Sequence, residues 1–466
     1  MSNRFIFSSF RSERAKSPPE TETQPAVEAR VPAVAKPAPE AEARPALLEE
    51  KVRLHGKIID EFNLAFIDKM SREELLRGIS GYVSDFVVAE RIALNQKELA
   101  DFTDEIIDEM KGLGPLEPLL KDGTVSDILV NTHQAVYIER FGQLEETKVR
   151  FKDEAHLLRI ISKIVSDVGR RVDESSPTVD ARLADGSRVN VVVRPIAVDG
   201  PLMSIRKFSK RPYSMERLIE IDSLKQPIVD VLEAAVRGRV SIVVSGGTGS
   251  GKTTMLNALS ACISPKERLI TIEDSAELQL QQPHVGRMET RPPNAEGKGE
   301  IRQRELVKNA LRMRPDRIII GECRGDEAFD MLQAMNTGHE GSLTTIHANT
   351  PRDAIRRLEQ MVGMSNVPMS QQSIRQQISS AIQVIIQLQR FSDGKRRLVS
   401  VSEITGMEGD VVQMQEIYKF VREGIGKDGS VIGSFRATGI RPAFLAQLKT
   451  MGFDIPSSHF ETIHPL

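Results

Sequence analysis

A glycine-rich run with a single lysine is the feature whose residue types and spacing point most directly to chemistry. Residues 246–253 read Gly-Gly-Thr-Gly-Ser-Gly-Lys-Thr, directly after the apolar run 240–245 and before the helix-favouring run 254–259. In a strand–loop–helix context, the backbone N–H groups of such a loop point at phosphate oxygens. Lys252 would reach the β- and γ-phosphates, and the Thr253 hydroxyl would ligate Mg²⁺. The run predicts a nucleoside triphosphate site, and the alternative is a glycine turn that happens to precede a lysine. The residues predicted to bind the nucleotide here are Gly246, Gly247, Thr248, Gly249, Ser250, Gly251, Lys252, Thr253 and Thr254.

Two further apolar runs end in carboxylates. Residues 317–321 lead into Glu322, and residues 270–272 lead into Glu273. If both runs are strands of a parallel sheet, their carboxyl ends meet the phosphate loop at one edge. Glu322 is then predicted to orient or deprotonate the attacking water, and Glu273 to support Mg²⁺ or that water. Each carboxylate also has a plainer interpretation when taken alone. Glu322 could be a surface residue at the end of a buried strand, and Glu273 could belong to a helix cap and a solvated turn.

Two of the eight histidines, His339 and His347, flank the apolar run 342–346. An imidazole that donates to a phosphate can report hydrolysis to the rest of a sheet, so we predict nucleotide binding by His339 and a catalytic role for His347. The alternative is a pair of core histidines with satisfied hydrogen bonds. Zinc is disfavoured because no third ligand follows at the usual spacing.

Composition bounds the remaining possibilities. A chain of 466 residues predicts two or three folded units. The 63 basic and 65 acidic residues nearly balance, which disfavours nucleic acid as the main partner. Two cysteines leave no disulfide framework or four-cysteine zinc site and indicate a cytoplasmic location. No run approaches the ~18 apolar residues of a membrane span, and no secretory signal is expected, so any membrane association is predicted to be peripheral.

The elements that must position these residues fall into five predicted segments. They are a disordered Pro/Ala/Glu-rich tail (1–48), a helical segment (49–110), a smaller α+β domain (111–208), a hinge linker (209–215) and an α/β domain with C-terminal hairpins and a helix (216–466). The helical spacing of apolar residues in the helical segment is interrupted at two breakpoints, Met70-Ser71 and Leu94-Asn95, which predicts three helices. From Met215 onward helices and strands alternate, which favours a parallel sheet with crossover helices. Asp393-Gly394 predicts the turn of a hairpin.

The order of the motifs resembles that of the secretion ATPases that power type II and type IV secretion, type IV pili and archaeal filaments. Their phosphate loop, acidic box, Walker B strand and histidine box match, in that order, residues 246–253, 270–277, 317–322 and 337–351. Two earlier runs, 112–120 and 125–131, look more narrowly like the CpaF type, the motor of tight-adherence (Tad/Flp) pili.

The resemblance implies ATP with Mg²⁺, a RecA-like motor domain, and a homo-hexameric ring at the cytoplasmic face of the inner membrane that works on a membrane platform protein. It also implies that arginines of the N-terminal domain approach the phosphates. Arg182, Arg188, Arg194 and Arg206 lie in the matching stretch. We favour Arg194 and Arg206, and the alternative is that they are solubility charges on edge strands.

The leading hypothesis is therefore an ATP hydrolase that drives filament assembly, with a type IV secretion ATPase moving protein or DNA as the closest rival. A nucleic-acid motor on the same core is disfavoured by the balanced charge. A further alternative is a scaffold protein that binds ATP without hydrolysing it. In such a protein Glu322 would not be needed.

Overall fold

The computed structural model describes residues 53–54, 70–208, 212–293 and 297–465, all of which belong to one compact unit, Leu48–Leu466. The predicted tail 1–48 and residues 209–211 of the predicted hinge lie outside the described residues. So does most of the first predicted helix, 55–69. Across the described residues, no helix is long and apolar enough to cross a membrane. The fold is mixed α/β, as predicted.

Two helices follow the predicted breakpoints closely. Ser71 caps the first, where its hydroxyl accepts from the Glu74 N–H at 3.2 Å and the Glu74 carboxylate accepts from the Ser71 N–H at 2.7 Å. Asn95 and Glu98 repeat this capping box at the second helix. Such reciprocal caps satisfy N–H groups that a helix start otherwise leaves unpaired, so the sequence places both helix starts locally.

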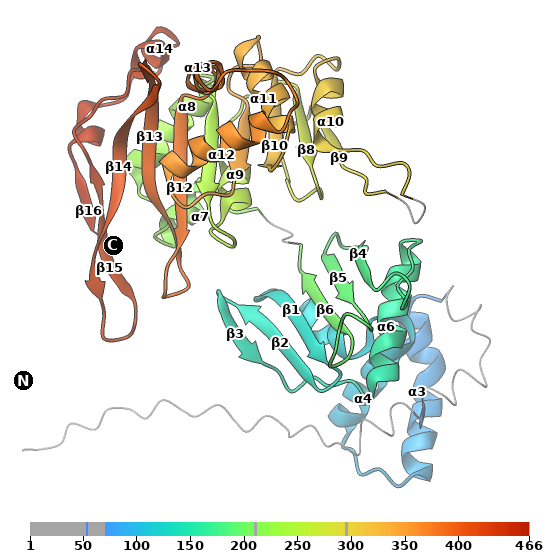
Figure 1. Ribbon diagram of the computed structural model, residues 1–466. Coiled ribbons are helices and arrows are strands. Elements are labelled where there is room, and N and C mark those ends of the chain that lie inside the picture. The colour runs from blue at the N-terminus through green and yellow to red at the C-terminus, as the bar shows by residue number, and fades with distance from the viewer. Residues whose placement is uncertain (1–52, 55–69, 209–211, 294–296, 466) are drawn as a thin grey trace, which may run out of the picture. The chain divides into compact units, whose positions relative to one another are not determined.

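A six-stranded antiparallel sheet follows these helices, with the strand order β3-β2-β1-β6-β5-β4 (Figure 1). One helix, α6, buries its apolar stripe against the alternating apolar residues of the sheet, which forms a separate core. The elements of this part are α3 (Arg72–Ala89), α4 (Gln96–Lys111), η1 (Gly114–Leu116), α5 (Glu117–Lys121), β1 (Val125–Thr132), β2 (Ala135–Arg140), β3 (Gln143–Glu146), α6 (Glu154–Asp167), β4 (Thr178–Arg182), β5 (Arg188–Val192) and β6 (Leu202–Arg206).

The second sheet has ten strands in the order β16-β15-β14-β13-β12-β7-β11-β10-β8-β9. The six strands from β12 to β9 pair in parallel, which confirms the predicted parallel sheet. Its strands and crossover helices are α7 (Met215–Glu220), α8 (Gln226–Arg237), β7 (Ile242–Gly246), α9 (Lys252–Ala261), β8 (Leu269–Glu273), β9 (Val285–Glu289), α10 (Gln303–Ala310), β10 (Arg317–Cys323), α11 (Glu327–Asn336), β11 (Leu343–Ile346), α12 (Pro351–Gly363) and α13 (Gln371–Ala381).

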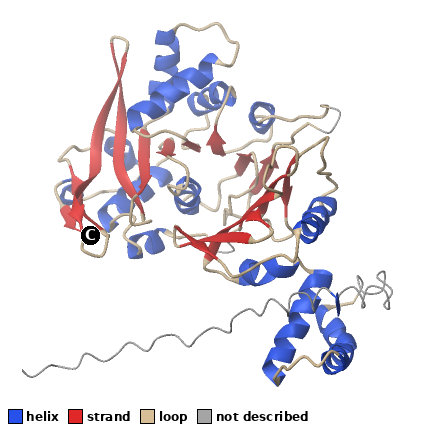
Figure 2. Ribbon diagram, turned by 60° about the horizontal axis from the view of Figure 1, so that its bottom comes forward, coloured by secondary structure: helices blue, strands red, loops and turns tan. Residues whose placement is uncertain are grey.

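Helices cover both faces of this parallel sheet (Figure 2). Successive residues of a strand point to opposite faces, so Ile242 and Val244 of β7 enter the core with α8 and α9. Val243 between them enters the core with α11, α12 and α13. Burial on both faces explains why these strands read as continuous apolar runs instead of alternating ones.

The C-terminal elements extend the sheet in antiparallel fashion. The hairpin predicted at Asp393-Gly394 is present, with Gly394 at φ +77°. Its first strand also pairs in parallel with β7, a pairing that the hairpin signal alone did not indicate. The predicted C-terminal helix is present and begins at Leu445. These elements are β12 (Val384–Arg390), β13 (Arg396–Glu408), β14 (Val411–Ile425), β15 (Val431–Ala437), α14 (Leu445–Thr450), η2 (Ser457–Phe460) and β16 (Ile463–Pro465).

Cys323 lies in the α/β core and the partly buried Cys262 packs against it, which has a measurable consequence. Burial raises the pKa of the Cys262 thiol to about 12 and raises that of the fully buried Cys323 well above its ordinary value. Since the thiolate is the reactive form, we expect both thiols of the native protein to react with a disulfide reagent at pH 8 at least about 10²-fold more slowly than free cysteine. Both should react at the ordinary rate in denaturant. Rapid labelling of the native protein would contradict the burial of these side chains.

Candidate nucleotide site

The glycine-rich loop joins the end of β7 to the start of α9. Gly249 and Gly251 have φ values of +68° and +96°, a region that L side chains rarely adopt. A Cβ on Gly246 would lie 2.3 Å from the Ser250 hydroxyl and 2.8 Å from the Leu388 carbonyl oxygen. Glycine is therefore required at these three positions for conformation or space, and the helix begins at Lys252 with its N–H groups available to an anion.

Lys252 and Glu322 meet beside this loop. The Lys252 ammonium lies 3.8 Å from a Glu322 carboxylate oxygen and donates to the Gly247 carbonyl at 3.2 Å. Burial lowers the pKa of Lys252, and the Glu322 charge opposes that shift. Arg324 donates its Nε–H to the other Glu322 oxygen at 3.0 Å and lies 3.3 Å from an Asp274 oxygen. The structure thus brings the predicted lysine and catalytic carboxylate together within one charged network.

Glu273 occupies a more buried position than a solvated turn would provide. Its side chain is 2% exposed, and burial raises its pKa, although backbone N–H groups work against that shift. One carboxylate oxygen accepts from the N–H groups of Glu277 and Leu278 at 2.7 and 2.8 Å. The other oxygen is buried and has no hydrogen-bond partner among the described residues. Glu273 therefore holds the turn after β8 in place and keeps one acceptor unused.

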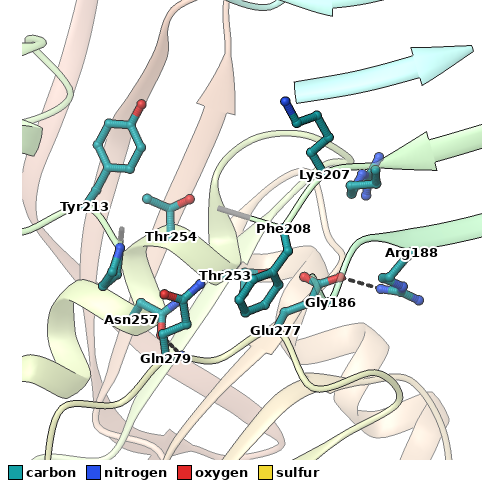
Figure 3. Close-up of a pocket in the computed structure, with 12 residues that line it drawn as sticks. Gly186, Arg188, Lys207, Phe208, Tyr213, Thr253, Thr254, Asn257, Glu277 and Gln279 are labelled. Carbon is teal, nitrogen blue, oxygen red and sulfur yellow. Dashed lines mark hydrogen bonds and ion pairs between the residues drawn. The ribbon is translucent and has the colours of Figure 1, made fainter. Parts of the chain in front are cut away.

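A cavity opens where the first turn of α9 faces the antiparallel sheet (Figure 3). Thr253 and Thr254 lie on one wall with Asn257, whose side-chain oxygen accepts from the Gln279 N–H at 2.9 Å. Phe208 and Tyr213 supply aromatic surface. The remaining lining residues are Gly186, Arg188, Arg206, Lys207, Pro212, Glu277 and Gln279. Threonine hydroxyls, cations and aromatic rings at one cavity suit a nucleotide.

These residues fit Mg²⁺ bound together with a nucleotide. Thr253 lines the cavity and carries a hydroxyl oxygen, and the unpaired Glu273 oxygen is an acceptor of the type that Mg²⁺ prefers. The carboxylate that lines the same cavity as Thr253 is that of Glu277, however, whereas the predicted support for Mg²⁺ was Glu273. No group of three or more His, Cys, Asp or Glu residues within the described ranges could hold a metal by itself, so phosphate oxygens would supply part of the coordination.

The four arginines of the N-terminal sheet separate into two groups. Arg188 pairs with Glu277 and Arg182 with Glu289 and Ser275, so both contact the α/β domain. Arg206 lines the cavity and donates to Asp127 at 3.0 Å. Arg194 instead bonds to Glu154 at 3.3 Å and to the Val198 carbonyl at 3.2 Å, both in its own domain. Phosphate binding by Arg206 therefore stays a prediction. The contacts of Arg194 do not support phosphate binding by that residue.

The two histidines lie at opposite ends of β11. Because β11 runs parallel to β7, with Ile346 opposite Ser245, His347 emerges at the edge that carries the glycine loop. His339 precedes the strand, at the end where the Gly341 N–H bonds to Ser241 at 3.1 Å. Strands rise about 3.3 Å per residue, so the four residues of β11 alone separate the two ends by roughly 13 Å. His339 therefore lies away from the glycine loop of its own chain, which does not support nucleotide binding there by His339, and the roles of both histidines stay predictions.

Comparison with known proteins identifies the family. The family described as type II/IV secretion system protein matches residues 109–421, more than half of the chain. The chain belongs to this family. A putative conjugal transfer protein of Mycobacterium tuberculosis is 35% identical over 309 residues, covering 65% of this chain and 87% of the relative. The type IV secretion system protein VirB11 of Bartonella henselae is 31% identical over 347 residues, covering 66% and 95%. Among solved structures, the VirB11 ATPase of Brucella suis in complex with sulphate is 28% identical over 62% of this chain and 92% of that chain, with a TM-score of 0.34.

This secretion-system protein also has functional candidates that sequence analysis missed. Arg390 and Arg396 flank the β12–β13 turn, and Arg396 donates its Nε–H to the Gly249 carbonyl at 2.8 Å. Arg324 and Gln303 contact the acidic box, with Gln303 donating to Asp274 at 2.8 Å. Arg390 ends an apolar run, as Glu322 and Glu273 do, so the same rule of strand ends could have found it. It was missed because the Asp-Gly turn marked this run as a hairpin.

Proposed function

We propose that this chain is an ATP hydrolase that uses Mg²⁺ and turns domain movement into transport at a membrane. The observation that carries the proposal is the 3.8 Å approach of Lys252 to Glu322 beside a glycine loop at the carboxyl edge of a parallel sheet. Lysine, carboxylate and oriented N–H groups are the parts that phosphoryl transfer to water requires.

The chain's own residues would divide the chemistry as follows. The loop N–H groups and Lys252 would hold the phosphates, and the Thr253 hydroxyl would hold Mg²⁺, which neutralises charge on the phosphates when bound. Glu322 would position a water molecule in line with the γ-phosphorus and accept its proton. As the new P–O bond forms, the bond from phosphorus to the bridging oxygen breaks, and ADP and inorganic phosphate leave.

Phosphate release from the purified full chain with ATP and Mg²⁺ tests this step. We expect turnover on the scale of seconds to minutes, and no turnover above the Lys252→Ala background would reject hydrolysis in favour of an ATP-binding scaffold. Strong stimulation by DNA or RNA that declines steeply with salt would instead indicate a nucleic-acid motor.

For the transported material, our first candidate is pilin subunits of a Tad/Flp filament. The runs 112–120 and 125–131 support it, through their resemblance to the CpaF type. The second candidate is a type IV secretion ATPase that moves protein or DNA, which the names of the conjugal transfer and VirB11 relatives favour. Deleting the gene decides between them, because loss of surface pili supports the first and loss of conjugal or effector transfer with pili retained supports the second.

A homo-hexameric ring at the cytoplasmic face of the inner membrane, docked on a platform protein, completes the proposal. The family resemblance supports this assembly. Mass measurement by light scattering, with and without nucleotide, tests the ring, and membrane fractionation in cells with and without the platform gene tests the docking.

A further inference from the structure

One carboxylate of the antiparallel sheet meets two arginines of the β12–β13 turn. Glu139 of β2 lies 3.7 Å from an Arg390 nitrogen and 3.5 Å from an Arg396 nitrogen, with its side chain 17% exposed. Arg390 also donates to the Gly142 carbonyl in the β2–β3 turn. These contacts join the N-terminal sheet to the α/β domain at a point that the proposed mechanism does not use.

The same two arginines contact the glycine loop. Arg396 donates to the Gly249 carbonyl at 2.8 Å, and its side-chain stem passes 3.5 Å from where a Cβ on Gly251 would stand. An Arg390 nitrogen lies 3.5 Å from the corresponding point on Gly249. Both guanidinium groups are therefore within a few ångströms of the loop that would hold the phosphates.

The sheet topology produces this arrangement. Because β12 runs parallel to β7, with Leu388 opposite Gly246, β12 ends at the same edge as the loop. Arg390 stands two residues beyond Leu388, and Arg396 is the first residue of the returning strand β13. The tight turn at Asp393-Gly394 keeps the two arginines together.

The charges of Glu139, Arg390 and Arg396 would allow a bound phosphate to change the contacts among these three residues. Two guanidinium groups face one carboxylate, so Glu139 neutralises only part of their charge. Arginine binds phosphate oxygens through paired, charge-assisted hydrogen bonds. A terminal phosphate at the loop and the Glu139 carboxylate would therefore compete for the same donors.

We propose that Arg390 and Arg396 bind the terminal phosphate and that Glu139 competes with it for them. A triphosphate in the loop thereby weakens the contact between the N-terminal sheet and the β12–β13 turn, and its hydrolysis restores that contact. This inference rests on the proposed function only in placing a nucleotide at residues 246–253. It gives the two arginines a sensing role that distinguishes a triphosphate from a diphosphate.

Equilibrium binding of a non-hydrolysable ATP analogue and of ADP to the full chain tests the proposal. We expect Arg390→Gln and Arg396→Gln each to weaken binding of the triphosphate analogue about tenfold and that of ADP less than about twofold, in keeping with the loss of one charge-assisted hydrogen bond. Glu139→Gln should tighten triphosphate binding several-fold, because the competing carboxylate is removed. Arg436→Gln is the matched control, since Arg436 pairs with Glu423 at 2.7 Å in the β14–β15 hairpin.

Amide hydrogen exchange provides a second measurement. If the two arginines had only a structural role, the triphosphate analogue would not change the exchange rate near Glu139. The triphosphate analogue should accelerate exchange in residues 135–146 of the wild type and leave it unchanged in the double variant Arg390→Gln/Arg396→Gln. Equal losses for both nucleotides, or tighter binding after removal of the arginines, would overturn the inference. Those outcomes leave the proposed function intact, because wild-type phosphate release and the Lys252→Ala variant are measured separately.

Discussion

Replacing Glu322 with glutamine should reduce phosphate release by at least about 10²-fold while ATP remains bound. Glutamine keeps the shape of the side chain but cannot accept a proton, and a general base typically contributes about 10²–10⁴-fold. It also removes a negative charge 3.8 Å from the lysine that would hold the phosphates, so binding should be retained or strengthened. Single-turnover phosphate release and equilibrium binding of a fluorescent ATP analogue measure the two effects separately.

Lys252→Ala is the companion variant, because it should fail at a different step. Loss of the charge-assisted contacts to the phosphates should weaken nucleotide binding roughly 10- to 100-fold. Circular dichroism should be unchanged in both variants. Hydrolysis at the wild-type rate in either variant would show that this loop and this carboxylate are not the active site.

Arg317→Met should destabilise the α/β domain by roughly 3–5 kcal/mol, the usual cost of leaving one partner of a buried ion pair behind. Arg317 is fully buried at the start of β10 and makes a two-pronged contact with Glu267, at 2.8 and 2.9 Å. It also donates to the Val236 carbonyl at 2.7 Å, so the substitution removes the main partner of a buried carboxylate and a second hydrogen bond. Urea unfolding followed by circular dichroism measures the change.

Two further variants separate charge burial from lost packing. Arg317→Met combined with Glu267→Met should recover much of the stability, because a buried ion pair replaced by apolar groups of similar size is often nearly neutral. Arg436→Gln, which breaks an exposed ion pair, should cost less than about 1 kcal/mol. A loss of that small size for Arg317→Met would mean that the buried pair contributes little.

Local patterns predicted much of the α/β fold. The glycine loop, the apolar runs and the capping residues Ser71 and Asn95 depend on interactions within a few residues, so their positions follow from neighbouring sequence. The joint location of Lys252 and Glu322 also followed, because parallel strands bring their carboxyl ends to one edge. The division into domains at residue 208 and the roles of the site residues remain predictions.

The sequence by itself thus determined the fold class, the glycine loop and the neighbouring position of Glu322. Tertiary structure decided which other candidates lie near them. His339 and His347 lie close in sequence, yet one short strand sends them to opposite edges of the sheet. Arg194 bonds to Glu154 of its own domain, whereas Arg390 and Arg396, on either side of the β12–β13 turn, lie beside the glycine loop. Such pairings join residues as many as 257 positions apart, from Glu139 to Arg396. They depend on strand order and long-range packing that no local pattern encodes.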